Sequence, residues 1–284
     1  MTDSTGGVPF QIQNLQQGNR YIKIGTTLFP CPFANLSDFP PDLPQDQEII
    51  TVLSKQRGRL VLEHDFSHVT KSGHGVRPSE AEAMRLASKH TSAPVPEVIF
   101  ADFGPDYGNI VMTLIPGSRL GETWDTLDEK SKGSICLQVW DIISKIRTIP
   151  RPSELQCLFQ CVADGSLTQD PLLEDLKDPA RPLISDSDLR ARILARYFHF
   201  GGRQYEHQLP EMLPRSDMTV FTYADIAPRN IMIDQQNNVT GILGWEWAGI
   251  LRPAFWGDWS IWMDRTAPQR WDISGINAAR KILF

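Results

Sequence analysis

The residues of this chain best suited to chemistry are Asp225 and Asn230, which lie five positions apart in the stretch FTYADIAPRNIMID. Apolar runs flank a polar loop that contains Pro228, so the stretch predicts strand, loop and strand. A carboxylate held in such a loop can take a proton from an attacking hydroxyl, while an amide oxygen can hold a metal ion on the phosphates. The spacing of the two side chains therefore suits phosphoryl transfer.

The longer stretch 221–249 resembles the catalytic segment of the aminoglycoside phosphotransferase and choline kinase family, which shares the protein-kinase-like fold. In that family the loop reads roughly His-Gly-Asp, four residues and Asn, and an Ile-Asp-Trp-Glu segment follows two strands later. Beyond Asp225 and Asn230, the residues that fit a fungal-type version of the pattern are Pro228, Arg229, Trp245, Glu246, Trp247, Ala248 and Gly249.

The resemblance implies that Asp225 is the catalytic base and Asn230 a metal ligand, with ATP and magnesium as cofactors and a small molecule as acceptor. Two departures stand out. The His-Gly pair is replaced by Tyr223 and Ala224, and the metal-binding Asp is replaced by Gly244. The pattern as a whole implies membership of the family. Gly244 offers only its backbone carbonyl as a ligand, so the sequence leaves phosphate transfer undecided.

Three hypotheses follow from the loss of that carboxylate. The chain is a small-molecule kinase with an altered metal site, or a repurposed enzyme that keeps Asp225 as an acid or base, or a binding pseudokinase. Glu246 lies two residues after Gly244, so strand alternation could direct it to the same side. A Glu is nevertheless common at that position in the family even when the Asp is present.

Composition describes a globular protein that acts without nucleic acid. The 284 residues are 41% hydrophobic and 22% charged, and the net charge is −6 with a pI near 5.5. A negative net charge disfavours nucleic acid as a partner. The four cysteines, the absence of an N-terminal signal pattern and the absence of a long apolar run together predict a cytoplasmic protein without a membrane span. Cys157 and Cys161 are expected to be buried thiols.

The resemblance implies an α+β, two-lobed fold with a small antiparallel-sheet lobe and a mainly helical large lobe. Four prolines between residues 31 and 45 indicate an extended connector. We therefore expect an N-terminal extension and Pro-rich connector over 1–45, a small nucleotide-type lobe over 46–116, and a large catalytic-type lobe over 117–284. An acidic insert is expected over 148–188.

Within the small lobe the family places a lysine on a strand, an acid on the following helix and a nucleotide-binding hinge. Lys71 corresponds to the lysine and Glu82 to its acidic partner, with Glu80 as the substitute if Glu82 caps the helix instead. The hinge candidates are Met112, Thr113 and Leu114. Only Gly58 lies where a glycine-rich phosphate loop is expected, which weakens the case for a nucleotide.

Hydrophobic periodicity predicts the elements that position these residues. Helices are expected over 46–55, 79–89, 126–147 and 189–207, with Ser79–Glu82 and Thr126–Glu129 as capping boxes. Strands are expected over 21–29, 59–66, 67–71, 98–101, 109–114, 231–233 and 239–243.

The expected insert is strongly acidic, with seven acids and two bases between residues 164 and 188. Two interpretations follow: a solvated loop, which is favoured, or an acidic surface that attracts a cationic acceptor. Further along the chain, Asp258 resembles a late Asp that braces the catalytic loop in the family.

Overall fold

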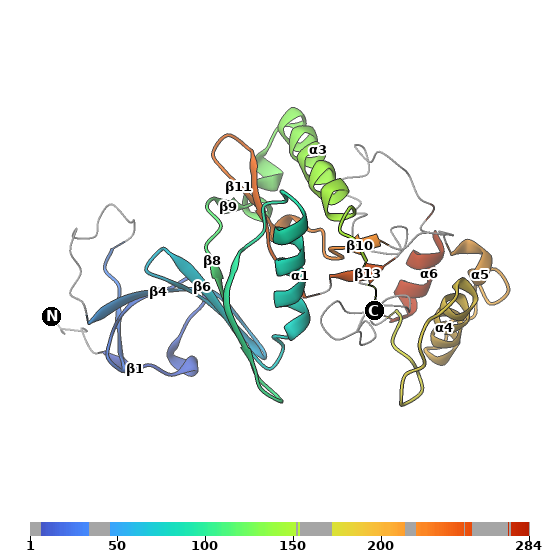
Figure 1. The fold of residues 1–284 in the computed structure, drawn as a ribbon, viewed down its shortest axis with the longest axis horizontal. Helices are drawn as coiled ribbons and strands as arrows, with labels where there is room; N and C mark the ends of the chain where they lie inside the picture. Colours follow the sequence, from blue (N-terminus) through green and yellow to red (C-terminus); the bar gives the residue numbers. More distant parts are fainter. Residues whose placement is uncertain are drawn as a thin grey trace. The chain divides into compact units, whose positions relative to one another are not determined.

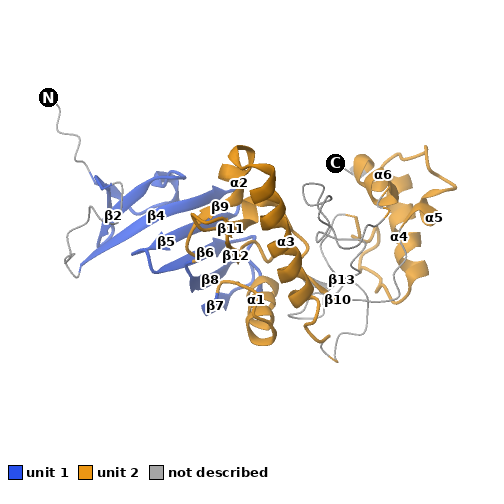
Figure 2. Ribbon diagram, turned by 90° about the horizontal axis from the view of Figure 1, so that it is seen from above, with its two compact units in different colours: residues 1–78, 97–114 blue, residues 79–96, 115–284 orange. Residues whose placement is uncertain are grey.

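The computed structural model describes residues 7–33, 46–151, 153, 172–213, 220–246, 248–251, 272 and 274–283. The chain forms two compact units (Figure 2). Unit 1 comprises residues 1–78 and 97–114, and unit 2 comprises residues 79–96 and 115–284. One boundary therefore falls between Leu114 and Ile115, directly after the hinge candidates Met112, Thr113 and Leu114.

Unit 1 is an eight-stranded sheet in the order β1-β3-β2-β4-β5-β6-β8-β7. Its strands β1, β4, β6 and β8 are labelled in Figure 1. Every neighbouring pair in it is antiparallel. Its strands are β1 (Val8–Pro9), β2 (Arg20–Ile24), β3 (Thr27–Pro30), β4 (Gln47–Gln56), β5 (Arg59–His64), β6 (His68–Gly73), β7 (Val98–Phe103) and β8 (Gly108–Thr113).

One face of this sheet is closed by an apolar cluster. Leu60 and Leu62 on β5 pack with Ile50 and Val52 on β4 and with residues of the N-terminal strands. Because side chains alternate along a strand, Arg59, Val61 and Glu63 lie on the opposite face of β5. The hairpin predicted over residues 59–71 is confirmed by the pairing of β5 with β6.

One expectation for the N-terminal half is wrong. Residues 46–55 are not a helix, because Gln47–Gln56 forms a strand paired with both β2 and β5. The described part of the expected extension, 7–33, supplies three strands of the same sheet. A short apolar run fits either a helix or a strand, and the two neighbouring strands decided in favour of the strand.

Unit 2 contains the helices and two small antiparallel sheets. The helices are α1 (Pro78–His90), α2 (Leu120–Thr123), α3 (Glu129–Ile146), α4 (Asp186–His199), α5 (Leu209–Met212) and α6 (Ser274–Leu283). One sheet pairs β10 (Val220–Thr222) with β13 (Gly249–Leu251). The other has the order β12-β11-β9, with β9 at Ser118–Arg119, β11 at Ile231–Ile233 and β12 at Val239–Ile242.

Both expected capping boxes are corrected. Helix α1 already includes Pro78, so Ser79 lies inside the helix rather than at its N-cap. Helix α3 begins at Glu129, and the side chain of Asp128 accepts a hydrogen bond from the backbone N–H of Ser131. Asp is as good an N-cap as Ser or Thr, and it stands two positions after the predicted Thr126.

Helix α4 is shorter at its C-terminal end than predicted. It begins after Ser185, whose side chain accepts from the Asp188 N–H, and it ends at His199 instead of residue 207. Gly201 has a φ of 87°, a left-handed conformation that ends helices. The Gly201-Gly202 pair is therefore the helix stop.

Residues 79–96 are grouped with unit 2, whereas the sequence-based division places them in the small lobe. One reason is a backbone hydrogen bond from Ile242 N–H on β12 to the Pro94 carbonyl, 3.0 Å long. In the part of the chain that the structure describes, no helix is both long enough and apolar enough to cross a membrane.

Candidate active site

The loop that carries Asp225 and Asn230 joins β10 to β11. Pro228–Asn230 forms one turn of 3-10 helix, in which the Asn230 N–H donates to the Ala227 carbonyl at 2.9 Å. Buried strands hold both ends of the loop, since Phe221 and Ile231 are fully buried. The loop geometry is therefore set by packing on both sides.

The structure brings the two predicted residues together. The Asn230 side-chain amide donates to Asp225 Oδ2 at 2.7 Å and to the Asp225 backbone carbonyl at 3.0 Å. Arg229 Nη2 donates to Asp225 Oδ1 at 2.6 Å. Both carboxylate oxygens are thus oriented, and the amide oxygen of Asn230 faces away from the carboxylate.

The electrostatic environment of Asp225 favours a base rather than a permanently ionised group. Burial raises the pKa of Asp225 above its ordinary value, and the nearby charge of Glu246 raises it further. Arg229 and the hydrogen bond from Asn230 act in the opposite direction. A carboxylate with a raised pKa accepts a proton more readily, which suits general base catalysis.

Tyr223 occupies the position of the family's histidine and braces the same loop. Its hydroxyl donates to the Leu243 carbonyl, and its ring meets the buried Trp245 ring edge-on with centroids 4.9 Å apart. Burial, followed by the charges of Asp225 and Glu246, raises the pKa of Tyr223 well above its ordinary value. The phenol therefore remains protonated and keeps donating.

Replacing Tyr223 by Phe tests this brace. The Leu243 carbonyl would lose its donor in a buried place, so we expect the free energy of unfolding to fall by about 1 to 3 kcal/mol. Urea denaturation measures the change. Tyr107, which is 47% exposed, provides a control, because Tyr107→Phe should alter stability by less than about 0.5 kcal/mol.

Ala224 takes the place of the family's glycine and keeps a left-handed backbone, with φ at 72°. Only glycine adopts this conformation without a steric penalty, and an alanine costs roughly 1 kcal/mol there. The left-handed backbone at Ala224 therefore comes at some cost in stability.

Gly244 also has a left-handed backbone, with φ at 78°. A Cβ at this position would lie 3.0 Å from Cγ and Nδ2 of Asn230 and 3.1 Å from its Oδ1. The Leu243 N–H donates to the Asn230 carbonyl at 2.8 Å, so the strand end and the loop are joined just before Gly244. Position 244 thus lies against the Asn230 amide.

This arrangement supplies only part of a magnesium site. The amide oxygen of Asn230 suits a hard cation, and no carboxylate stands at 244 to complete the pair. Among the described residues, no group of three or more His, Cys, Asp or Glu side chains could hold a metal ion. Because position 244 is a glycine, Asn230 lacks the second side-chain ligand of the family's metal pair.

Lys71 is a buried residue on β6 of unit 1. On α1, Glu80 is buried, whereas Glu82 is 39% exposed in its side chain and lies 3.8 Å from Arg85. Glu80 shares the buried helix face with Ala83, Met84 and Ala87, and Glu82 is off that face. The helical periodicity of the sequence could have indicated that Glu80, and not Glu82, is the buried acid of α1. The pairing of either acid with Lys71 stays a prediction.

The hinge candidates lie at the end of β8. Met112 is buried and pairs with Val69 and Val98. The Thr113 N–H donates to the Glu97 carbonyl at 2.9 Å, and the Thr113 hydroxyl accepts from the Glu97 N–H. The Thr113 N–H is therefore already used within the sheet, and hinge contacts by Met112, Thr113 or Leu114 remain a prediction.

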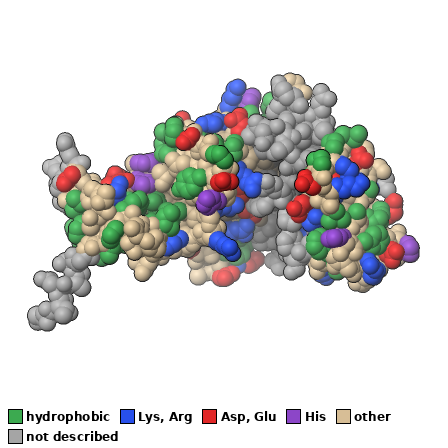
Figure 3. All heavy atoms as spheres, turned by 90° about the horizontal axis from the view of Figure 1, so that it is seen from below, with side chains coloured by type: hydrophobic (Ala, Val, Ile, Leu, Met, Phe, Trp, Pro, Cys, Tyr) green, Lys and Arg blue, Asp and Glu red, His purple; other side chains and the backbone are tan. Residues whose placement is uncertain are grey.

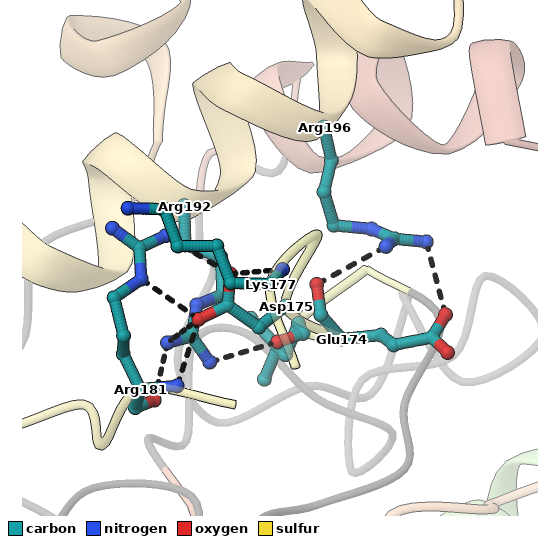
Figure 4. A network of polar contacts seen from close by, with 7 residues as sticks. Glu174, Asp175, Lys177, Arg181, Arg192 and Arg196 are labelled. Atoms are coloured by element: carbon teal, nitrogen blue, oxygen red, sulfur yellow. Dashed lines mark hydrogen bonds and ion pairs between the residues drawn. The ribbon is translucent and has the colours of Figure 1, made fainter. Parts of the chain in front are cut away.

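The described part of the acidic insert is not a simple solvated loop. The Asp175 side chain is 1% exposed and receives hydrogen bonds from Arg181 at 2.9 Å and from Arg192 at 3.0 Å (Figure 4). Glu174 pairs with Arg196 at 3.4 Å. The arginines of α4 neutralise these acids, so they lend no support to a cationic acceptor.

Surface charge elsewhere is mixed, with acidic and basic side chains intermingled on the face drawn in Figure 3.

Cys31 and Cys136 are free thiols. Four predicted features, Cys157, Cys161, Trp247 and Asp258, lie outside the described residues.

Comparison with known proteins assigns the family. Residues 51–255, well over half of the chain, match the model of the phosphotransferase enzyme family. The chain belongs to that family, which confirms the predicted kinase-like α+β class. A search of curated proteins gave no match.

Solved structures show weaker similarity. The aminoglycoside phosphotransferase APH(3'')-Id of Streptomyces rimosus, in complex with ADP and streptomycin, is 15% identical with a TM-score of 0.40, over 79% of this chain and 88% of that one. WbdD is 11% identical with a TM-score of 0.35, over 71% of this chain. This chain spans about a third of the length of WbdD, or 34%.

Proposed function

We propose that this chain is a cytoplasmic, ATP-dependent phosphotransferase acting on the hydroxyl of a small molecule, with Asp225 as the general base. The observation that carries the proposal is the oriented Asp225 carboxylate, held by Asn230 and Arg229 in an environment that raises its pKa. Family membership supports the same chemistry. The proposed nucleotide unit is the sheet that carries Lys71, with the hinge at 112–114.

In the proposed reaction the substrate hydroxyl donates its proton to a carboxylate oxygen of Asp225. Its oxygen then attacks the terminal phosphorus of ATP, and ADP leaves with the bridging oxygen. Arg229 and Asn230 keep the carboxylate in place during the transfer. Lys71 is the residue proposed to bind phosphate oxygens of ATP.

The deciding measurement is calorimetric titration with ATP, with and without magnesium, followed by detection of ADP in the presence of candidate alcohols. Binding of ATP together with acceptor-dependent ADP formation supports the proposal. Absence of ATP binding under both conditions contradicts it.

A second candidate is an enzyme that keeps Asp225 as an acid or base and no longer transfers phosphate. The observation that favours it is Gly244, where a left-handed glycine lies against Asn230 in place of a carboxylate. Turnover of a small molecule without ATP, abolished by Asp225→Asn, would establish this candidate. A pseudokinase would bind ligand equally well with and without Asp225.

Replacing Gly244 by Asp separates the two enzymes. An L-residue at this φ beside Asn230 is strained, so we expect the ligand-free protein to lose about 1 to 3 kcal/mol of unfolding free energy. For a kinase, the added oxygen ligand should raise magnesium-dependent ATP turnover by about 10²- to 10³-fold. Thermal melting and ADP release measure the two effects.

Gly244→Ala is the matched control, because it introduces the same backbone strain without an oxygen ligand. It should lose stability like Gly244→Asp and gain no turnover. For a repurposed enzyme, Gly244→Asp should instead lower native activity, since the new carboxylate would lie near Asp225 as a like charge.

A further inference from the structure

The face of the unit 1 sheet that carries Lys71 also carries a second cation, Arg59. In the β5–β6 pair Val61 lies opposite Lys71, and directly opposed residues of an antiparallel pair share a face. Arg59 precedes Val61 by two positions, so it lies on that face as well. The two residues are diagonal neighbours, and such positions are about 7 to 8 Å apart.

Glycines create the space beside Arg59. The turn between β4 and β5 is closed tightly, with Gln56 opposite Arg59 and Gly58 at a φ of 80°. A Cβ on Gly73 would lie 2.1 Å from the Gly58 carbonyl oxygen, and a Cβ on Gly75 would lie 2.8 Å from Nε of Arg59. The Arg59 side chain therefore lies directly against the bare backbone of Gly75.

The segment that supports Arg59 is tied down at several points. The Gly75 N–H donates to the Gly58 carbonyl at 3.1 Å. His74 contacts the β7–β8 loop through a hydrogen bond with the Asp106 carbonyl and an edge-on contact with the Tyr107 ring. These contacts hold the end of the sheet in one arrangement, which pre-organises the position of Arg59.

The turn itself is poorly suited to cradling phosphate. It consists of two residues, so it offers few backbone N–H groups, and the nearby Gly75 N–H is already donated to the Gly58 carbonyl. A phosphate cradle instead needs several backbone N–H groups directed at the anion. The positive charge at this end of the face must therefore come from side chains, and a guanidinium binds two phosphate oxygens at once.

On these grounds, and resting on the proposed ATP-dependent function, we propose that Arg59 acts with Lys71 as a second phosphate-binding cation. The pair of side chains supplies positive charge to phosphate oxygens, a role that magnesium otherwise fills. Affinity for ATP should then depend weakly on magnesium and strongly on Arg59.

Calorimetric titration of ATP in EDTA tests the proposal with three variants. Arg59→Ala should weaken ATP binding by about 10- to 100-fold, as expected for loss of a charge-assisted contact. Arg59→Gln should weaken ATP binding to a similar extent. This variant keeps the test valid if Arg59→Ala fails to fold. Arg57→Ala removes an equal charge from the exposed tip of the same turn and should leave affinity within about threefold.

Adenosine is the second probe, because it lacks phosphates. Its affinity should be the same in the wild type and in both Arg59 variants. Unchanged ATP affinity in folded Arg59 variants overturns the role of Arg59 and leaves the proposed function standing. Failure of the wild type to bind ATP with or without magnesium overturns both.

Discussion

Replacing Asp225 by Asn should lower the rate of catalysis by about 10²- to 10⁴-fold, the usual contribution of a general base. The amide keeps the size of the side chain but cannot accept the substrate proton. The Asp225 carboxylate lies in hydrogen-bond contact with Arg229 and Asn230, and both contacts come from neighbouring residues of the same loop. Affinity for ATP should therefore change little, and the loss should appear in kcat.

Single-turnover ADP release, with calorimetry for ATP affinity, measures the two effects separately. Asp141→Asn is the matched control, since that side chain is 64% exposed on α3 and pairs only locally with Lys145. A kcat within threefold of wild type in Asp225→Asn would contradict a catalytic role. Equal thermal melting of the two variants would exclude misfolding as the cause of a loss.

Replacing Asp175 by Asn should lower the free energy of unfolding by about 3 to 5 kcal/mol. The carboxylate accepts from the Arg181 side chain and backbone N–H, from the Lys177 N–H and from Arg192. Arg192 is 4% exposed in its side chain, so an amide at 175 would remove the counter-charge that is hydrogen-bonded to this buried guanidinium, and Asp188 would remain as the other acid acting on it. Guanidinium chloride denaturation measures the loss.

Glu174→Gln is the control in the same network. Its side chain is 67% exposed at 3.4 Å from Arg196, and exposed pairs contribute about 0 to 1 kcal/mol. A change in Asp175→Asn no larger than that of Glu174→Gln would show that the buried pair does not stabilise this part of unit 2.

Asp175 should also make the free energy of unfolding fall at low pH. The side-chain hydrogen bonds from Arg181, then backbone N–H groups and the charge of Arg192, hold the pKa of Asp175 well below its ordinary value. A depressed pKa contributes stability above the unfolded pKa of about 3.9, and this contribution is lost as pH falls toward the folded value. The stability difference between wild type and Asp175→Asn should therefore shrink below pH 4.

The local pattern around Asp225 was sufficient to predict the strands and the loop that hold Asp225 and Asn230 together. Flanking apolar runs specify β11 and β12, and the five-residue spacing of Asp225 and Asn230 matches a loop of fixed length. The left-handed backbones of Ala224 and Gly244 were not predicted from this pattern. Strands and helices with strong periodicity, such as α3 and β8, were also within reach of the sequence.

Tertiary structure decided what depends on partners far away in the chain. Gln47–Gln56 became a strand because β2 and β5 satisfy its backbone, and no local pattern carries that information. In the described part of the acidic insert, Arg192 and Arg196 on α4, outside the segment that was counted, pair with Asp175 and Glu174 in addition to Arg181 within that segment. Likewise, Arg59 joins the face of Lys71 only through the register of β5 and β6, which is a property of the pairing and not of either strand alone.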